Sequence, residues 1–371
     1  MKPSKNTQSF QHNKPLKIGI LLINLGTPDH PDTTAVRNYL RIFLSDPRVV
    51  EIPKFIWFFI LHGIILPFRS PKSAAKYKLI WTPEGSPLLV NSRKQANLLT
   101  GYLGEKLRAI GISSECVSIK LAMRYGNPSI PQGLQELREE GCQKILSVPL
   151  YPQYAASTTA SAHDALFDTL QHYRWQPAIR TITSYHDFSP YILALANKIR
   201  RYWEQFGRGD VLVLSFHGIP RFALEKGDPY FCFCQKTGRL LIEELKLEPS
   251  QYRISFQSRF GRTEWLQPYT TDTLHALASQ GTKRVDIFCP GFVSDCLETL
   301  EEIAMEGKND FLSAGGKEYH YISALNDTPE WINALAELCM QELQGWLPQP
   351  TPTVQDLQHS LERAQKLGAT F

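Results

Sequence analysis

Short apolar runs alternate with segments of helical periodicity along most of this chain, and this alternation limits its fold more than any other feature. A short apolar run bounded by turn residues is typical of a strand that is buried on both faces. Strands that alternate with helices form parallel sheets whose two faces are covered by those helices. The eight strands that we expect are Ile18–Leu25, Val117–Tyr125, Lys144–Leu150, Ile179–Ser184, Val211–Phe216, Arg253–Gln257, Arg284–Cys289 and Tyr319–Ala324.

The expected strands divide into two groups of four, and this division predicts two α/β domains. A chain of 371 residues is long for one compact unit and has room for two. The halves would meet near residues 149–156. The expected units are a disordered leader (1–15), a first domain (16–153), a second domain (154–328), a C-terminal helix that packs back on the core (329–347), and a Pro-rich linker with a tail helix (348–371).

The charge and the cysteine content exclude several classes of protein. The formal net charge is only +4 and no basic run occurs, so nucleic acid is not an expected partner. The seven cysteines are odd in number and form no C-x-x-C pair, which favours free thiols in a reducing cytoplasm. The leader Met1–Pro15 lacks the apolar core of a signal peptide, so we expect a cytoplasmic protein.

The most apolar stretch of the chain, Phe55–Phe68, allows two interpretations. It has 14 residues, whereas a membrane-spanning helix needs about 20, so it does not cross a bilayer. It is either a buried helix of the core or an exposed apolar lip. Such a lip would contact a flat hydrophobic ligand or the surface of a membrane, as a peripheral contact on its inner face.

Unusual residues gather where the expected strands end, and His217 is the most informative of them. It follows the apolar run Val211–Phe216 and precedes Gly218 and Pro220, which turn the chain away. Parallel sheets bind ligands beyond the carboxyl ends of their strands. Imidazole at such a place suits proton transfer or metal ligation at neutral pH, although a structural histidine in a turn would look the same. No glycine-rich phosphate loop is present, which disfavours a dinucleotide or ATP enzyme.

A second candidate cluster is acidic and lies in the expected helix Asp295–Glu306. Glu298, Glu302 and Glu306 recur every four residues, so on an α-helix they form a slowly drifting stripe. Like charges at this spacing repel each other unless cations or protons are bound between them. Asp295 and Glu298 also fit a capping box, and the other two acids fit an ordinary solvated face.

At these two places the chain resembles the ferrochelatases. The stretch Leu214–Pro220, followed by Lys226–Tyr230, is similar to the signature of that family. The stretch Cys289–Glu302 is similar to its acidic metal-site segment. Further similar segments follow in the order of the family over about residues 16–345; they are Asn24–Pro28, Gly85–Pro87, Tyr151–Tyr154, Ser157–Thr159 and Phe256–Gly261.

The resemblance implies two Rossmann-like domains, each with a parallel four-stranded sheet flanked by helices, and a porphyrin in the cleft between them. The reaction would be the insertion of Fe²⁺ into protoporphyrin IX. His217 and Glu298 would be the catalytic and metal-site pair, and Asp295, Glu302 and Glu306 would relay protons or metal. The implied porphyrin contacts are Leu25, Arg69, Tyr77, Ser86, Arg124, Tyr125 and Trp265.

Three departures from the family pattern refine these expectations. Cys296 stands where many members have a histidine two positions before the key acid, so no role of that histidine is carried over. No cysteine follows Cys339, so we expect no iron–sulfur cluster of the kind that animal members hold, and no other prosthetic group. Leu25 stands where members that use coproporphyrin often have tyrosine, which favours protoporphyrin IX.

Three other functions remain open from the residues alone. A cobalt chelatase for an earlier tetrapyrrole would share the fold and the metal-binding side chains. A non-catalytic porphyrin or haem carrier would bind the ligand without turnover, and a two-domain solute binder would explain the fold without the acids. We expect a monomer whose partners are protoporphyrin IX and Fe²⁺, with Fe²⁺ as a substrate.

Overall fold

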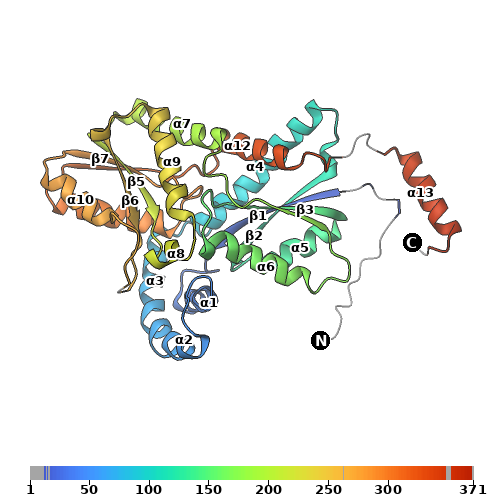
Figure 1. The fold of residues 1–371 in the computed structure, drawn as a ribbon, viewed down its shortest axis with the longest axis horizontal. Helices are drawn as coiled ribbons and strands as arrows, with labels where there is room; N and C mark the ends of the chain where they lie inside the picture. The colour runs from blue at the N-terminus through green and yellow to red at the C-terminus, as the bar shows by residue number, and fades with distance from the viewer. Residues whose placement is uncertain (1–11, 14, 16, 262, 348–351, 370–371) are drawn as a thin grey trace.

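Two parallel four-stranded sheets form the frame of the protein in the computed structural model (Figure 1), which describes residues 12, 13, 15, 17–261, 263–347 and 352–369. Every strand pairs with its neighbours in parallel. The expected fold class is confirmed. The strands are β1 (Lys17–Gly26), β2 (Val117–Tyr125), β3 (Cys142–Pro149), β4 (Ala178–Thr181), β5 (Val211–His217), β6 (Tyr252–Gln257), β7 (Arg284–Phe288) and β8 (Glu318–Ile322).

The two sheets repeat one topology. Their strand orders are β2-β1-β3-β4 and β6-β5-β7-β8, so in each sheet the first strand lies between the second and the third. The connection from the first strand to the second runs toward one edge, and the connection from the second strand to the third then crosses to the other side of the first. Ligands of parallel α/β sheets bind at the carboxyl ends of the strands where the order reverses in this way. The ends of β1 and β5 are thus the two positions at which the fold favours a site.

The boundary between the two halves lies later in the chain than expected. Strand β4 pairs with β3 from Lys144 to Ser147, so the first sheet extends to Thr181. A boundary after residue 153 would separate β4 from its sheet. The expectation followed the motifs near residues 149–156, whereas the hydrogen bonds of the edge strand determine where the sheet ends. The expected leader falls largely on residues 1–11 and 14, outside the described residues.

Helices cover both sheets, and three segments are π-helices with wider hydrogen-bonded turns. The π-helices are η1 (Leu61–Ile65), η3 (Ala156–Ala160) and η5 (Glu298–Glu306). The α-helices are α1 (Thr33–Leu44), α2 (Lys54–Ile60), α3 (Leu66–Ile80), α4 (Pro87–Ala109), α5 (Ile130–Glu139), α6 (Ser161–Leu170), α7 (Ser189–Phe206), α8 (Arg221–Glu225), α9 (Tyr230–Leu245), α10 (Thr270–Ser279), α11 (Gly307–Ser313), α12 (Pro329–Glu342) and α13 (Val354–Lys366).

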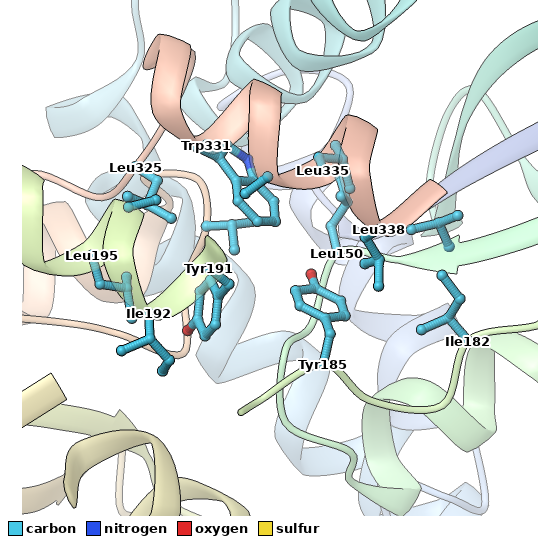
Figure 2. Packing of buried hydrophobic residues seen from close by; sticks show 14 of the residues in the cluster. Leu150, Ile182, Tyr185, Tyr191, Ile192, Leu195, Leu325, Trp331, Leu335 and Leu338 are labelled. Carbon is cyan, nitrogen blue, oxygen red and sulfur yellow. The ribbon is translucent and has the colours of Figure 1, made fainter. Parts of the chain in front are cut away.

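A shared apolar core joins the two halves. Helix α12 packs against α4 from the first half and against α7 from the second. Figure 2 shows Trp331 of α12 next to the rings of Tyr185 and Tyr191. The ring centroids of Tyr185 and Trp331 are 6.1 Å apart, and all three rings are buried. The C-terminal helix therefore stabilises the relative position of the two sheets, while α13 after it has no buried side chain.

The apolar stretch Phe55–Phe68 lies on the surface, so its interpretation as a buried core helix is wrong. It forms α2, η1 and the start of α3, in an arm that projects from the two sheets (Figure 1). Phe55, Phe59 and Phe68 are 76%, 60% and 70% exposed. Trp57 alone of the aromatic residues here turns inward, and its Nε1 donates to the carbonyl oxygen of Leu44. Among the described residues, no helix is both long enough and apolar enough to span a bilayer.

We expect the replacement Leu335→Ala in α12 to lower the free energy of unfolding by about 2–5 kcal/mol, because this side chain is fully buried between the halves. Urea denaturation would measure the change. The control Val354→Ala, at a position that is 85% exposed, should stay within about 0.5 kcal/mol of the parent. A loss below about 1 kcal/mol for Leu335→Ala would contradict the packing role of α12.

Candidate active site

His217 is the last residue of β5, at one of the two positions that the topology favours. It pairs in register with Gln257 at the end of β6. The next residue, Gly218, donates its N–H to the carbonyl oxygen of Gln257 at 2.8 Å. A Cβ atom at Gly218 would lie 2.7 Å from that oxygen, so this close approach requires glycine. The chain therefore turns sharply at the strand end and presents the imidazole beyond the sheet.

The imidazole of His217 is held in one orientation. Its Nδ1 lies 2.6 Å from the carbonyl oxygen of Gly218, so in the neutral ring Nδ1 donates and Nε2 carries the free lone pair. The rings of Trp265 and Phe292 lie 6.5 and 6.3 Å from the imidazole, centroid to centroid. The indole Nε1 of Trp265 is buried and has no hydrogen-bond partner within the described residues. Nε2 is thus available for a proton or a metal ion, beside apolar walls.

The acidic segment is a π-helix, and this corrects the expectation of an α-helical stripe. The N–H of Gly307 bonds to the carbonyl oxygen of Glu302, five residues earlier. Residues five apart are neighbours in such a helix, whereas on an α-helix they are 140° apart. Glu306 therefore lies beside Glu301, and Lys76 of α3 contacts both. Glu302 and Glu306, four residues apart, have different partners, because Glu302 bonds to Ser258 and Glu306 to Lys76.

Glu302 is held by Ser258 and lies close enough to His217 to be affected by its charge. The backbone N–H of Ser258 donates to Oε1 at 2.6 Å, and its hydroxyl donates to Oε2. Ser258 has a φ of 66°, a left-handed conformation that is unfavourable for serine and typical of functional sites. Burial raises the pKa of Glu302, and Ser258 and His217 oppose that rise. This carboxylate can therefore hold a proton or a cation close to His217.

Glu298 lies beside residues of the first half that the sequence also singled out. The side chain of Gln257 donates to its carbonyl oxygen at 3.0 Å. The pKa of Tyr77 is raised well above its usual range, first by burial and then by the charge of Glu298. Burial lowers the pKa of Arg69, whereas Glu298 raises it, and the guanidinium lies 4.4 Å from the centre of the Phe260 ring. The structure thus brings Glu298, Arg69 and Tyr77 together.

Leu25 and Ser86 lie at the end of β1, the second position that the topology favours. Leu25 packs with the apolar cluster that contains Tyr77. The hydroxyl of Ser86 is buried and accepts a hydrogen bond of 2.8 Å from Thr27, just beyond β1. The β1 end therefore contributes an apolar and a small polar residue to the same region as Glu298.

The polar groups of Arg124 and Tyr125 bond to Asp46. The guanidinium of Arg124 bonds to the buried carboxylate of Asp46, and the hydroxyl of Tyr125 bonds to it at 2.7 Å. Burial works to raise the pKa of Asp46, but Ser161 and Tyr125 lower it overall, so Asp46 stays charged. The structure does not bring these two residues to His217, and their expected porphyrin contacts stay a prediction.

The carboxylate of Asp295 is also bound by groups of the protein interior. It is 6% exposed, and its carboxylate accepts four hydrogen bonds. The donors are the hydroxyls of Thr299 and Tyr321, the N–H of Ala324 and the side-chain amide of Asn326. This carboxylate fixes the start of η5 to the loop after β8. Its expected part in a relay stays a prediction.

Sequence reasoning missed three residues of this site: Lys76, Ser258 and Glu301. Lys76 lies on α3, which was not expected as a helix because its apolar residues do not form a regular stripe. Ser258 matters through its backbone conformation, and no residue pattern reveals that. Glu301 was missed because we assumed the period of an α-helix for this segment. A cavity of about 650 Å³ between α7, α9 and α12 is lined by none of the predicted site residues.

Comparisons with known proteins agree with this geometry. SirB from Bacillus subtilis, solved with Fe³⁺, has a similar fold with a TM-score of 0.51 at 12% identity, over 89% of this chain and 97% of that one. Ferrochelatase from Dechloromonas aromatica is 53% identical over 97% of each chain. Ferrochelatase from Chromobacterium violaceum is 54% identical over 98% of this chain and 97% of that one.

The fold has two Rossmann-like halves with a histidine and carboxylates beyond the ends of their strands, and relatives that are more than half identical show that the chain is a metal chelatase. The family model for ferrochelatase matches residues 17–343. The chain belongs to the ferrochelatase family, which confirms the resemblance seen in the sequence.

We expect Asp295→Ala to lower the free energy of unfolding by about 2–5 kcal/mol, because it leaves buried donors without an acceptor. Thermal or urea denaturation would detect this. The control Glu204→Ala, at an exposed position of α7, should change stability by less than about 0.5 kcal/mol. A variant with full stability but little activity would instead assign Asp295 to the relay.

Proposed function

We propose that this protein inserts Fe²⁺ into protoporphyrin IX to form haem, with release of two protons. Membership of the ferrochelatase family supports the reaction. The observation that carries the proposal is the convergence of His217, Glu302 and Glu298, three groups that bind protons or cations, next to aromatic walls. A carrier or a solute binder would not need this combination.

The metal ion and the porphyrin make different demands on these residues. Fe²⁺ suits imidazole together with carboxylate, and His217 and Glu298 are our candidates for the metal-site pair. The ring must lose two pyrrole protons, and Nε2 of His217 has the free lone pair to accept them. Glu302, whose pKa burial raises, can take a proton from the imidazolium and restore the base. We therefore assign the first proton transfer to His217.

The walls of the site suit a flat apolar ring with acidic substituents. Trp265 and Phe292 flank the imidazole, and Leu25 lies on the side of the first half. A guanidinium is the natural partner of a propionate carboxylate, and Arg69 beside Glu298 would supply it. Leu25 favours protoporphyrin IX over coproporphyrin. A ring held against these walls can be bent, which exposes its nitrogen lone pairs to the metal.

We expect His217→Ala to lower kcat for haem formation by about 10²-fold or more, because the variant lacks the proposed proton acceptor. Anaerobic assays with Fe²⁺ and protoporphyrin IX would follow the loss of porphyrin fluorescence and the gain of the haem spectrum. Porphyrin binding should persist, and His275→Ala at an exposed position of α10 should behave as the parent.

Normal turnover by His217→Ala would contradict this assignment. Parallel assays of the parent with coproporphyrin III would test the choice of porphyrin. Turnover confined to cobalt and an earlier tetrapyrrole would replace the proposed reaction with that of a related chelatase, and binding without turnover would indicate a carrier.

We propose further that the exposed apolar face of the projecting arm contacts the membrane surface. We define this face by Phe55, Ile56, Phe58, Phe59, Ile64 and Phe68, all at least half exposed. The exposed cations Lys54 and Lys72 lie on either side of it along the chain and suit anionic lipid. An apolar porphyrin and its product partition into lipid, so this contact would bring the site close to both.

We expect the double variant Phe55→Ser and Phe59→Ser to weaken binding to vesicles of phosphatidylglycerol and phosphatidylcholine about tenfold or more per side chain, since burying one Phe contributes about 1.5–3 kcal/mol. Vesicle flotation would measure the bound fraction. Phe167→Ser, on α6 and 46% exposed, is the matched control. Equal flotation of parent and double variant would exclude a membrane contact through this face.

A further inference from the structure

Lys76 of α3 forms two ion pairs with the π-helix η5. Its Nζ lies 2.8 Å from Oε2 of Glu301 and 2.8 Å from Oε1 of Glu306. Within the described part of the chain, no other ion pair joins α3 to η5. The three side chains differ in exposure, because those of Lys76 and Glu306 are 40% and 51% exposed whereas that of Glu301 is 7% exposed. The ammonium group therefore binds both carboxylates of a half-buried pair on the side that faces solvent.

The π-helical geometry explains why one lysine reaches both acids. Glu301 and Glu306 are five residues apart and are brought together by the i to i+5 turn. Two carboxylates this close repel each other, and Glu306 contributes to the raised pKa of Glu301, after the larger effect of burial. A cation between them removes this repulsion. A positive charge therefore stabilises the pair of carboxylates, and in this chain Lys76 provides that charge.

Helix α3 carries a second cation on the same side. Arg69 lies seven residues before Lys76, about 10 Å along the helix, and is close enough to Glu298 to be affected by its charge. The two cations on α3 thus follow the same order as the acids that they face on η5. Arg69 lies near Glu298, and Lys76 contacts Glu306. The inner acids, Glu298 and Glu302, lie near His217, and the outer pair, Glu301 and Glu306, is bridged by Lys76.

We propose that Lys76 is a positioning residue for the metal ion: its ammonium group occupies the outer carboxylates, Glu301 and Glu306, and so prevents them from retaining a divalent cation. Two carboxylates without a counter-ion are good ligands for hard divalent cations. An arriving metal ion would bind there and stay outside the site. With Lys76 in place, the carboxylates left for the metal are those beside His217. The purpose of this role rests on the proposed function, but the test of the role does not depend on that function.

The test measures binding of Mn²⁺ alone, without porphyrin, from the loss of the free Mn²⁺ signal in electron paramagnetic resonance. We expect Lys76→Met to bind one more Mn²⁺ per chain than the parent protein. Adding Glu306→Gln to this variant should abolish the extra site. Lys76→Arg should behave as the parent, and Lys78→Met removes the same charge from an exposed position of the same helix without creating a site.

A second measurement excludes a merely structural role. Lys76→Met should have a KM for Fe²⁺ at least tenfold above that of the parent, because a cation held by Glu301 and Glu306 repels a second one from the site, while the KM for the porphyrin stays unchanged. Equal Mn²⁺ binding by parent and Lys76→Met would overturn the proposal. A folded Lys76→Met that loses porphyrin affinity without gaining Mn²⁺ would also overturn it, because Lys76 would then only support the packing of α3. Because Mn²⁺ binding needs no turnover, its result is independent of whether the protein makes haem.

Discussion

The carboxylates of the segment Asp295–Glu306 impose the strongest physical constraint on this structure, because several of them are brought close together and all but Glu306 are partly or fully buried. Separate hydrogen-bond donors and cations stabilise these carboxylates. Asp295 receives four internal hydrogen bonds, Glu302 receives the N–H and hydroxyl of Ser258, and the outer pair receives Lys76. Glu298 lies near Arg69 and Tyr77 of the first half. The distribution of donors thus decides which acid is left for substrate chemistry.

The repeated topology provides the donors in the right places. In both sheets the first strand is central, so the ends of β1 and β5 each have neighbours on both sides. At β5 the neighbour β6 supplies Gln257 and Ser258, which bond to η5. The first half supplies α3, which lies along the other side of η5. The site is therefore a junction of the two halves, and the apolar core around Trp331 keeps them in register (Figure 2).

Much of this arrangement could be predicted from the sequence, and the remainder has physical reasons for being hidden. The eight strands and the position of His217 follow from buried apolar runs and from the turn residues after them, which act locally. The π-helix does not, because η5 has the same residue types as an α-helix and differs only in hydrogen-bond partners. The pairing of β4, the exposure of Phe55–Phe68 and the contact of Lys76 with Glu301 all depend on segments far apart in the chain.

The position of α12 has a consequence for how the chain acquires its structure during synthesis. Its partner α4 is complete more than 200 residues before α12 is made. At roughly 5–20 residues per second, this gap lasts on the order of ten to forty seconds. Until α12 is made, the apolar face of α4, and later that of α7, lacks its cover, so the nascent chain exposes the surface on which its two halves later meet. The packing of α12 against both halves is therefore one of the last steps in which this core forms.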